Sequence, residues 1–190
     1  FYFVPCYVII PFRMKLLTLK FLLIFVYLLT SIPAFSSNAK NIKNLIIQPI
    51  PKKLINVEFK DLDDNTIYLD DYKNKLVIIN FWATWCAPCR EEMPSLNRLQ
   101  VNDNFNSLKI FPINVGRESV EKSVQFYKDL KINNLETYFD FSTKLPNKFA
   151  LRGLPSTIFI NKKGEEIGRI IGYVDFEDKD LINWLKEYDS

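Results

Sequence analysis

The sequence predicts an α/β domain in which a mixed central β-sheet is covered by helices on both faces. The run Lys75–Phe81 is almost entirely apolar, as in a strand buried on both faces. Strand-like and helix-like patterns then alternate, and an antiparallel hairpin and a helix end the chain. The length of 190 residues is sufficient for one domain with a sizeable core.

A short hairpin is predicted before the apolar run. Val57–Phe59 and Ile67–Leu69 alternate on either side of the turn-like Asp63–Asn65. The pattern becomes helical from Cys86 onward, and Pro94 inside this helix is expected to kink it. The apolar flank of the helix consists of Met93, Leu96 and Leu99.

The second half of the domain continues the alternation. Leu108–Val115 predicts an apolar strand, and Val120–Leu130 predicts a helix with an apolar register. That register consists of Val120, Val124, Tyr127 and Leu130. A short strand is predicted at Glu136–Phe141 and a short helix at Lys144–Ala150.

A hairpin and a helix complete the prediction. Ser156–Asn161 and Glu166–Ile171 flank the turn Lys162–Gly164. Asp178–Tyr188 predicts a closing helix. Its inward-facing residues are expected to be Leu181, Trp184 and Leu185.

The first 36 residues differ from the rest because they are mostly apolar and contain three basic and no acidic residues. Met14 begins a well-formed basic start, so residues 1–13 are interpreted as upstream sequence, with Cys6 incidental. The apolar stretch Phe21–Ile32 is shorter than the ~20 residues that a spanning helix needs. Pro33–Ser36 follow, with small residues at the −3 and −1 positions of a cleavage site after Ser36, as in a secretory signal peptide. An uncleaved membrane anchor is the alternative.

The charge of the remaining chain is balanced. The 25 basic residues exceed the 22 acidic ones by three, and that excess lies in residues 1–36. The basic residues are dispersed, so a nucleic-acid interface is not expected. Residues 37–53 contain Pro49 and Pro51 and are interpreted as a linker, which leaves residues 54–190 as the domain.

Cys86 and Cys89 lie where the apolar strand gives way to the helix. Two thiols at this spacing can close a disulfide ring or bind a metal. A structural zinc needs about four ligands, whereas the chain has three cysteines and no histidine. Arg90 follows Cys89, so the haem-attachment pattern is absent, and the lack of histidine excludes Cys–His nucleophilic catalysis. The shortage of metal ligands favours a redox dithiol, and a metal shared across a dimer is the alternative.

The segment Asn80–Cys89, NFWATWCAPC, resembles the active-site segment of thioredoxin-like proteins. Together with Arg90–Pro94, Ile113–Gly116 and Gly153–Thr157, it resembles the TlpA/ResA family of exported thiol–disulfide reductases. The resemblance covers about residues 55 to 188 and implies a thioredoxin fold. Many members of this family begin with a signal peptide or are held to the membrane by an N-terminal helix, in agreement with residues 1–36.

The resemblance also implies roles at the dithiol. Cys86 is expected at a helix N-terminus, where unpaired N–H groups and the helix dipole favour the thiolate, so it is the candidate nucleophile. Cys89 is expected to be more buried and to resolve the mixed disulfide. Asn80 stands where cytoplasmic thioredoxins carry an aspartate, so Glu92 is the candidate proton acceptor for Cys89. Neighbouring Glu91 is expected to be solvated.

The same resemblance identifies candidate substrate contacts. Pro155 corresponds to the cis-proline that faces the dithiol. The backbone of Leu154 would then be exposed to pair with an extended substrate segment. Trp85 is expected to shield the disulfide and contact partners, whereas Trp82 is expected to be structural.

The leading functional prediction is a periplasmic or otherwise extracytoplasmic thiol–disulfide oxidoreductase that reduces protein disulfides. No nicotinamide or flavin site is apparent and no cofactor is expected, so a membrane dithiol carrier would have to supply electrons. Relatives commonly reduce apocytochrome c before haem attachment, which makes this a candidate task. The alternatives are a redox-active copper chaperone or binding module, and a peroxiredoxin-like peroxidase. Against the peroxidase, Thr84 lies two residues before Cys86, whereas the peroxidase pattern places it three before.

Overall fold

The computed structural model describes residues 42–189. They belong to the second of the two units into which the chain divides, residues 37–190. The predicted targeting segment, residues 1–36, and the predicted start at Met14 lie outside the described residues. None of the helices formed by residues 42–189 has the length and apolar character that crossing a bilayer requires.

Eight strands form one mixed sheet within the described residues, in the order β1-β8-β7-β4-β5-β6-β2-β3. β4 pairs in parallel with β5, and β5 with β6, whereas the other neighbours are antiparallel. The strands are β1 (Leu45–Lys53), β2 (Glu58–Lys60), β3 (Thr66–Tyr68), β4 (Leu76–Trp82), β5 (Leu108–Asn114), β6 (Tyr138–Phe139), β7 (Ser156–Ile160) and β8 (Glu165–Ile171). Both predicted hairpins are therefore confirmed.

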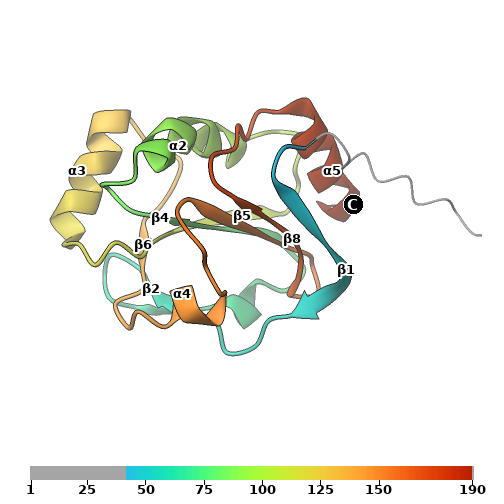
Figure 1. Ribbon diagram of the computed structural model, residues 1–190, viewed down its shortest axis with the longest axis horizontal. Helices are drawn as coiled ribbons and strands as arrows, with labels where there is room; N and C mark the ends of the chain where they lie inside the picture. Colours follow the sequence, from blue (N-terminus) through green and yellow to red (C-terminus); the bar gives the residue numbers. More distant parts are fainter. Residues whose placement is uncertain (1–41, 190) are drawn as a thin grey trace, which may run out of the picture. The chain divides into compact units, whose positions relative to one another are not determined.

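Helices cover both faces of this sheet, as predicted. α2 (Ala87–Leu99), α3 (Val120–Leu130) and α5 (Lys179–Asp189) pack on one face (Figure 1). The 3-10 helix η2 (Leu69–Tyr72) and the short α4 (Leu145–Lys148) pack on the other. Each layer has its own apolar cluster, so the sheet is buried from both sides.

Strand β4 lies at the centre, and all seven of its residues are buried. Successive side chains of a strand point to opposite faces. Val77, Ile79 and Phe81 accordingly join the cluster under α4, whereas Ile78 and Trp82 join the cluster under α2. Asn80 lies between Ile78 and Trp82 in this alternation, so its polar side chain is directed at α2.

Residues 37–53 were predicted to be a linker, and this prediction is wrong for Leu45–Lys53, which form β1. Leu45 to Ile47 pair with β8, and the register shifts between Ile47 and Lys52. Pro49 and Pro51, which suggested a linker, both fall within that irregularity. Because β1 is an edge strand, a residue without an N–H is tolerated there.

Candidate active site

Cys86 and Cys89 form a disulfide at the start of α2, with their Cα atoms 5.3 Å apart. Cys86 is the N-cap residue of the helix, and its Sγ accepts a hydrogen bond of 3.3 Å from the backbone N–H of Cys89. Pro88 occupies the first turn, where a helix needs no internal N–H donor. The N–H groups of this turn and the helix dipole therefore favour negative charge on the Cys86 sulfur.

The two cysteines differ in access to solvent. Cys86 retains 5 % of its surface and Cys89 none. Trp85, immediately before them, is 67 % exposed, so its indole is available to a partner. Trp82 is fully buried and packs on Phe126 with ring centroids 4.7 Å apart, which confirms its structural role.

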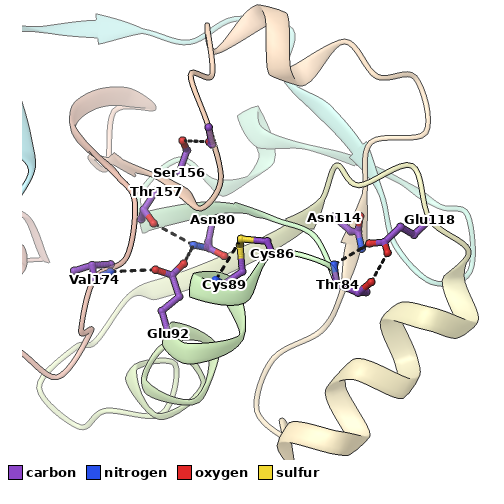
Figure 2. Close-up of a disulfide and its surroundings, with 11 residues drawn as sticks. Asn80, Thr84, Cys86, Cys89, Glu92, Asn114, Glu118, Ser156, Thr157 and Val174 are labelled. Carbon is purple, nitrogen blue, oxygen red and sulfur yellow. Dashed lines mark hydrogen bonds between the residues drawn. A yellow bond between two sulfur atoms is a disulfide. The ribbon is translucent and has the colours of Figure 1, made fainter.

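Glu92 lies one helical turn after Cys89 and is completely buried. Its Oε1 accepts a 2.7 Å hydrogen bond from Asn80 Nδ2, and its Oε2 accepts one of 3.1 Å from the backbone N–H of Val174. Figure 2 shows the Asn80 side chain between this carboxyl group and the disulfide. The neighbouring Glu91 is exposed, as predicted.

The surroundings of Glu92 favour its neutral form. Burial raises the pKa of Glu92 from its ordinary 4.5 to about 8, although the hydrogen bonds from Asn80 and Val174 lower it in part. Desolvation penalises a carboxylate, and two N–H donors compensate only part of that penalty. A carboxyl group with a pKa near 8 can exchange protons with a thiol, whose ordinary pKa is about 8.5.

Thr157 is a member of this polar group that sequence reasoning missed. It lies directly opposite Asn80 in the pairing of β7 with β4, and both side chains are fully buried. Asn80 Nδ2 also donates to Thr157 Oγ1 over 3.1 Å. The only sequence signal was its place two residues after Pro155, which does not indicate the strand register.

The Leu154–Pro155 peptide bond is cis, as the resemblance predicted. The carbonyl of Pro155 accepts a 2.8 Å hydrogen bond from the N–H of Gly172. The preceding Leu154 is partly buried against both apolar clusters, and its backbone pairs with no group in the described part of the chain. The backbone N–H and carbonyl of Leu154 are therefore not used by the described part of the fold.

Glu118 is a second residue that the sequence did not indicate. Its carboxylate accepts hydrogen bonds from the backbone N–H of Thr84, over 2.8 Å, and from the Thr84 hydroxyl. Figure 2 shows these contacts on the side of the disulfide away from Glu92. A Cβ at Gly116 would lie 2.6 Å from Glu118 Oε2 and 2.8 Å from the Ala83 Cβ, so glycine permits the close approach.

A comparison with known families and proteins agrees with this geometry. The model of the AhpC/TSA family matches residues 50–165, which include the dithiol. The thiol-disulfide oxidoreductase ResA of a Bacillus cereus strain is 34% identical over 125 residues, covering 65% of this chain and 70% of that protein. The chain belongs to the ResA-like thiol–disulfide oxidoreductases of the AhpC/TSA family. As a member of that family, it is a disulfide redox enzyme.

Solved structures place the ResA-like chain in the thioredoxin fold. A thiol:disulfide interchange protein of the thioredoxin family from Chlorobium tepidum TLS superposes with a TM-score of 0.62 at 23% identity, over 75% of this chain and 99% of that one. The pneumococcal exposed lipoprotein thioredoxin Etrx1 from Streptococcus pneumoniae strain TIGR4 gives a TM-score of 0.59 at 27% identity, over 69% and 98%. The fold predicted from the sequence is therefore confirmed.

Proposed function

We propose that this chain reduces disulfide bonds of proteins outside the cytoplasm, with Cys86 as nucleophile, Cys89 as resolving thiol and Glu92 as proton acceptor. The observation that carries the proposal is the asymmetry of the disulfide. Cys86 keeps 5 % of its surface at a helix N-terminus, whereas Cys89 keeps none and lies one helical turn before the buried Glu92. An incoming partner can reach only the first sulfur.

The reaction has two exchange steps. The Cys86 thiolate attacks a sulfur of the target disulfide, which forms a mixed disulfide and releases one target thiolate. Cys89 then loses its proton to Glu92 and attacks Cys86 Sγ, which closes the ring and releases the second target thiolate. Two electrons pass to the target, and protons from Glu92 and solvent complete its two thiols.

The substrate segment would bind beside the ring. The unpaired backbone of Leu154 can form strand-like hydrogen bonds with an extended peptide, a recognition mode that tolerates many sequences. Pro155 holds this segment next to β8 through the Gly172 N–H, and the exposed Trp85 offers an apolar surface to the peptide side chains.

The location and the specific task are also proposals. The basic and apolar residues 1–36 support export, and an exposed lipoprotein thioredoxin is among the similar structures. Export makes a membrane dithiol carrier the electron donor, with membrane association through residues 1–36 if they are retained. Oxidised apocytochrome c, whose haem-binding cysteines are separated by two residues, is the substrate that we propose.

Trapping tests this function. In the full chain, Cys89→Ser should accumulate a mixed disulfide through Cys86 with an oxidised Cys-x-x-Cys-His peptide, and Cys86→Ser should not. A redox titration against glutathione should give a potential nearer to thioredoxin (about −270 mV) than to a strong periplasmic oxidant (about −120 mV). A potential near the latter would overturn the reducing direction. Copper retention without a trapped peptide would favour a chaperone, and rapid peroxide consumption a peroxidase.

A further inference from the structure

The amide of Asn80 is incompletely hydrogen-bonded in a fully buried position. Its Nδ2 donates to two acceptors, Glu92 Oε1 and Thr157 Oγ1, but its Oδ1 has no partner among residues 42–189. A buried carbonyl oxygen without a donor destabilises the folded state, so its retention calls for an explanation. Figure 2 places this side chain between the Glu92 carboxyl group and the disulfide.

The two ends of an asparagine amide have opposite hydrogen-bonding character. The N–H₂ end matches an ionised carboxylate, which only accepts, whereas the oxygen end matches a protonated carboxyl group, which donates. Likewise, a thiolate only accepts and matches the N–H₂ end, whereas a thiol can donate its S–H to the oxygen end. The hydroxyl of Thr157 can donate or accept, so it tolerates either orientation of Asn80.

We infer that the Asn80 amide turns over as a proton passes between Cys89 and Glu92, so that both groups are hydrogen-bonded before and after the transfer. This rests on the proposed role of Glu92 as proton acceptor. Before transfer, Nδ2 donates to the Glu92 carboxylate and Oδ1 accepts from the Cys89 S–H. Afterwards, the Glu92 O–H donates to Oδ1, and Nδ2 donates to the Cys89 thiolate. In net terms the thiol loses one proton, the carboxylate gains one, and no electrons move.

The disulfide form shows the Asn80 orientation that we infer for the state before proton transfer. Nδ2 donates to Glu92, the arrangement expected for the ionised carboxylate, and Oδ1 has no partner among residues 42–189 because the disulfide has no thiol proton to offer. An aspartate at position 80 would provide only acceptors and could not bind a carboxylate and a thiolate together. Asn80 is thus a positioning residue, which acts through Glu92 and Cys89.

Few other titratable groups lie near Glu92. β4 and β7 present Asn80 and Thr157 on this side, which do not titrate. Those on α2 and on the segment between β8 and α5 are Cys86, Cys89, Arg90, Glu91, Arg98, Tyr173, Asp175, Glu177 and the exposed Asp178. Arg98 and Glu177 are bound to each other, and Tyr173 and Asp175 are exposed. The pKa of Glu92 is accordingly set by burial, which raises it, and by two N–H donors, which lower it.

The resolving step can be measured in the full chain with dithionitrobenzoate. Reduced protein releases one thionitrobenzoate as Cys86 is labelled and a second as Cys89 closes the ring. Asn80→Leu should slow the second release about tenfold at pH 7, since one hydrogen bond to a charged group is worth about that factor. It should also move the midpoint of the pH–rate profile upward, because a donor that lowers the pKa of Glu92 is lost.

Asn97→Leu is the matched control, because Asn97 is also buried and binds the backbone of residues 133 and 134, away from Glu92. It should lower stability without moving the midpoint. An unchanged second release in Asn80→Leu, with slow release in Glu92→Gln, would overturn the amide switch and leave the proton acceptor in place. An unchanged release in Glu92→Gln as well would overturn both.

A second measurement does not depend on the folding of a variant. In the reduced wild-type chain, the side-chain ¹H–¹⁵N signals of Asn80 should move with pH at the midpoint of the Glu92 carboxyl ¹³C signal. In Glu92→Gln the same signals should not titrate at that midpoint. Signals of Asn80 that stay constant through the Glu92 titration would refute the inference.

Discussion

Glu92→Gln tests the electrostatics of the site through the stability of the oxidised protein. The pKa of Glu92 is raised from 4.5 to about 8 in the folded state, so the folded protein binds more protons than the unfolded chain between these pH values. Stability must therefore fall as pH rises from 4.5 to 8, and the loss is complete above the folded pKa. Below pH 4.5 the carboxyl group is protonated in both states and contributes nothing to this slope.

The magnitude follows from the two pKa values. They differ by 3.5, and one unit corresponds to about 1.4 kcal/mol, so ionising Glu92 costs the folded state about 5 kcal/mol at high pH. Glutamine never ionises and does not have this cost. Its single amide oxygen can accept from only one of the two donors, Asn80 Nδ2 or the Val174 N–H, and the lost acceptor is a penalty of about 1–3 kcal/mol that does not vary with pH.

The assay is urea unfolding of oxidised wild type and Glu92→Gln at a series of pH values from 4 to 9. The variant should be the less stable protein at pH 4 and the more stable one at pH 9, with the difference changing by up to about 5 kcal/mol. Glu91→Gln is the matched control, because the exposed Glu91 should give a difference that is nearly independent of pH. A Glu92→Gln difference that stays constant across this range would refute the raised pKa.

Three further predictions concern neighbouring features. Gly116→Ala should destabilise the protein by about 1–3 kcal/mol in urea unfolding, because the new Cβ would overlap the Ala83 Cβ and displace the Glu118 carboxylate; wild-type stability would contradict the close approach. Arg169→Met should cost about 3–5 kcal/mol, because it leaves the buried Glu166 unpaired, and adding Glu166→Met should recover most of the loss. Trp85→Ala should change stability by less than about 0.5 kcal/mol but weaken capture of the peptide by Cys89→Ser, and unchanged capture would remove Trp85 from the binding surface.

The fold could be predicted largely because its signals are local. The apolar run of β4, the alternation of the hairpins and the helical register of α5 each follow from a few adjacent residues. α3 shows the limit. Its predicted boundaries are confirmed, but of the predicted register only Tyr127 is buried, together with the unpredicted Ser123 and Phe126. Ser123 is buried since it accepts a hydrogen bond from Asn114, a contact that only the tertiary structure creates.

The site was only partly predictable for a related reason. Cys86, Cys89 and Glu92 lie on one helix, so their spacing places them together. Thr157 and the Val174 N–H come from distant strands and loops, and their approach depends on sheet register. The edge strand β1 was missed because its prolines suggested a linker, whereas an irregularity in an edge strand also accommodates them.

Because the carboxyl group lies on α2 rather than on β4, it also accepts a hydrogen bond from the segment after β8. Glu92 accepts the Val174 N–H, and Ser95, one turn later, accepts the N–H of Phe176. Both donors belong to the segment after β8, where Gly172 also holds the carbonyl of Pro155. Protonation of Glu92 would weaken the hydrogen bond that its carboxyl group accepts from the Val174 N–H. If a peptide pairs with Leu154 as proposed and strengthens the Val174 hydrogen bond, the pKa of Glu92 should fall, and the carboxyl ¹³C signal of Glu92 would report the shift.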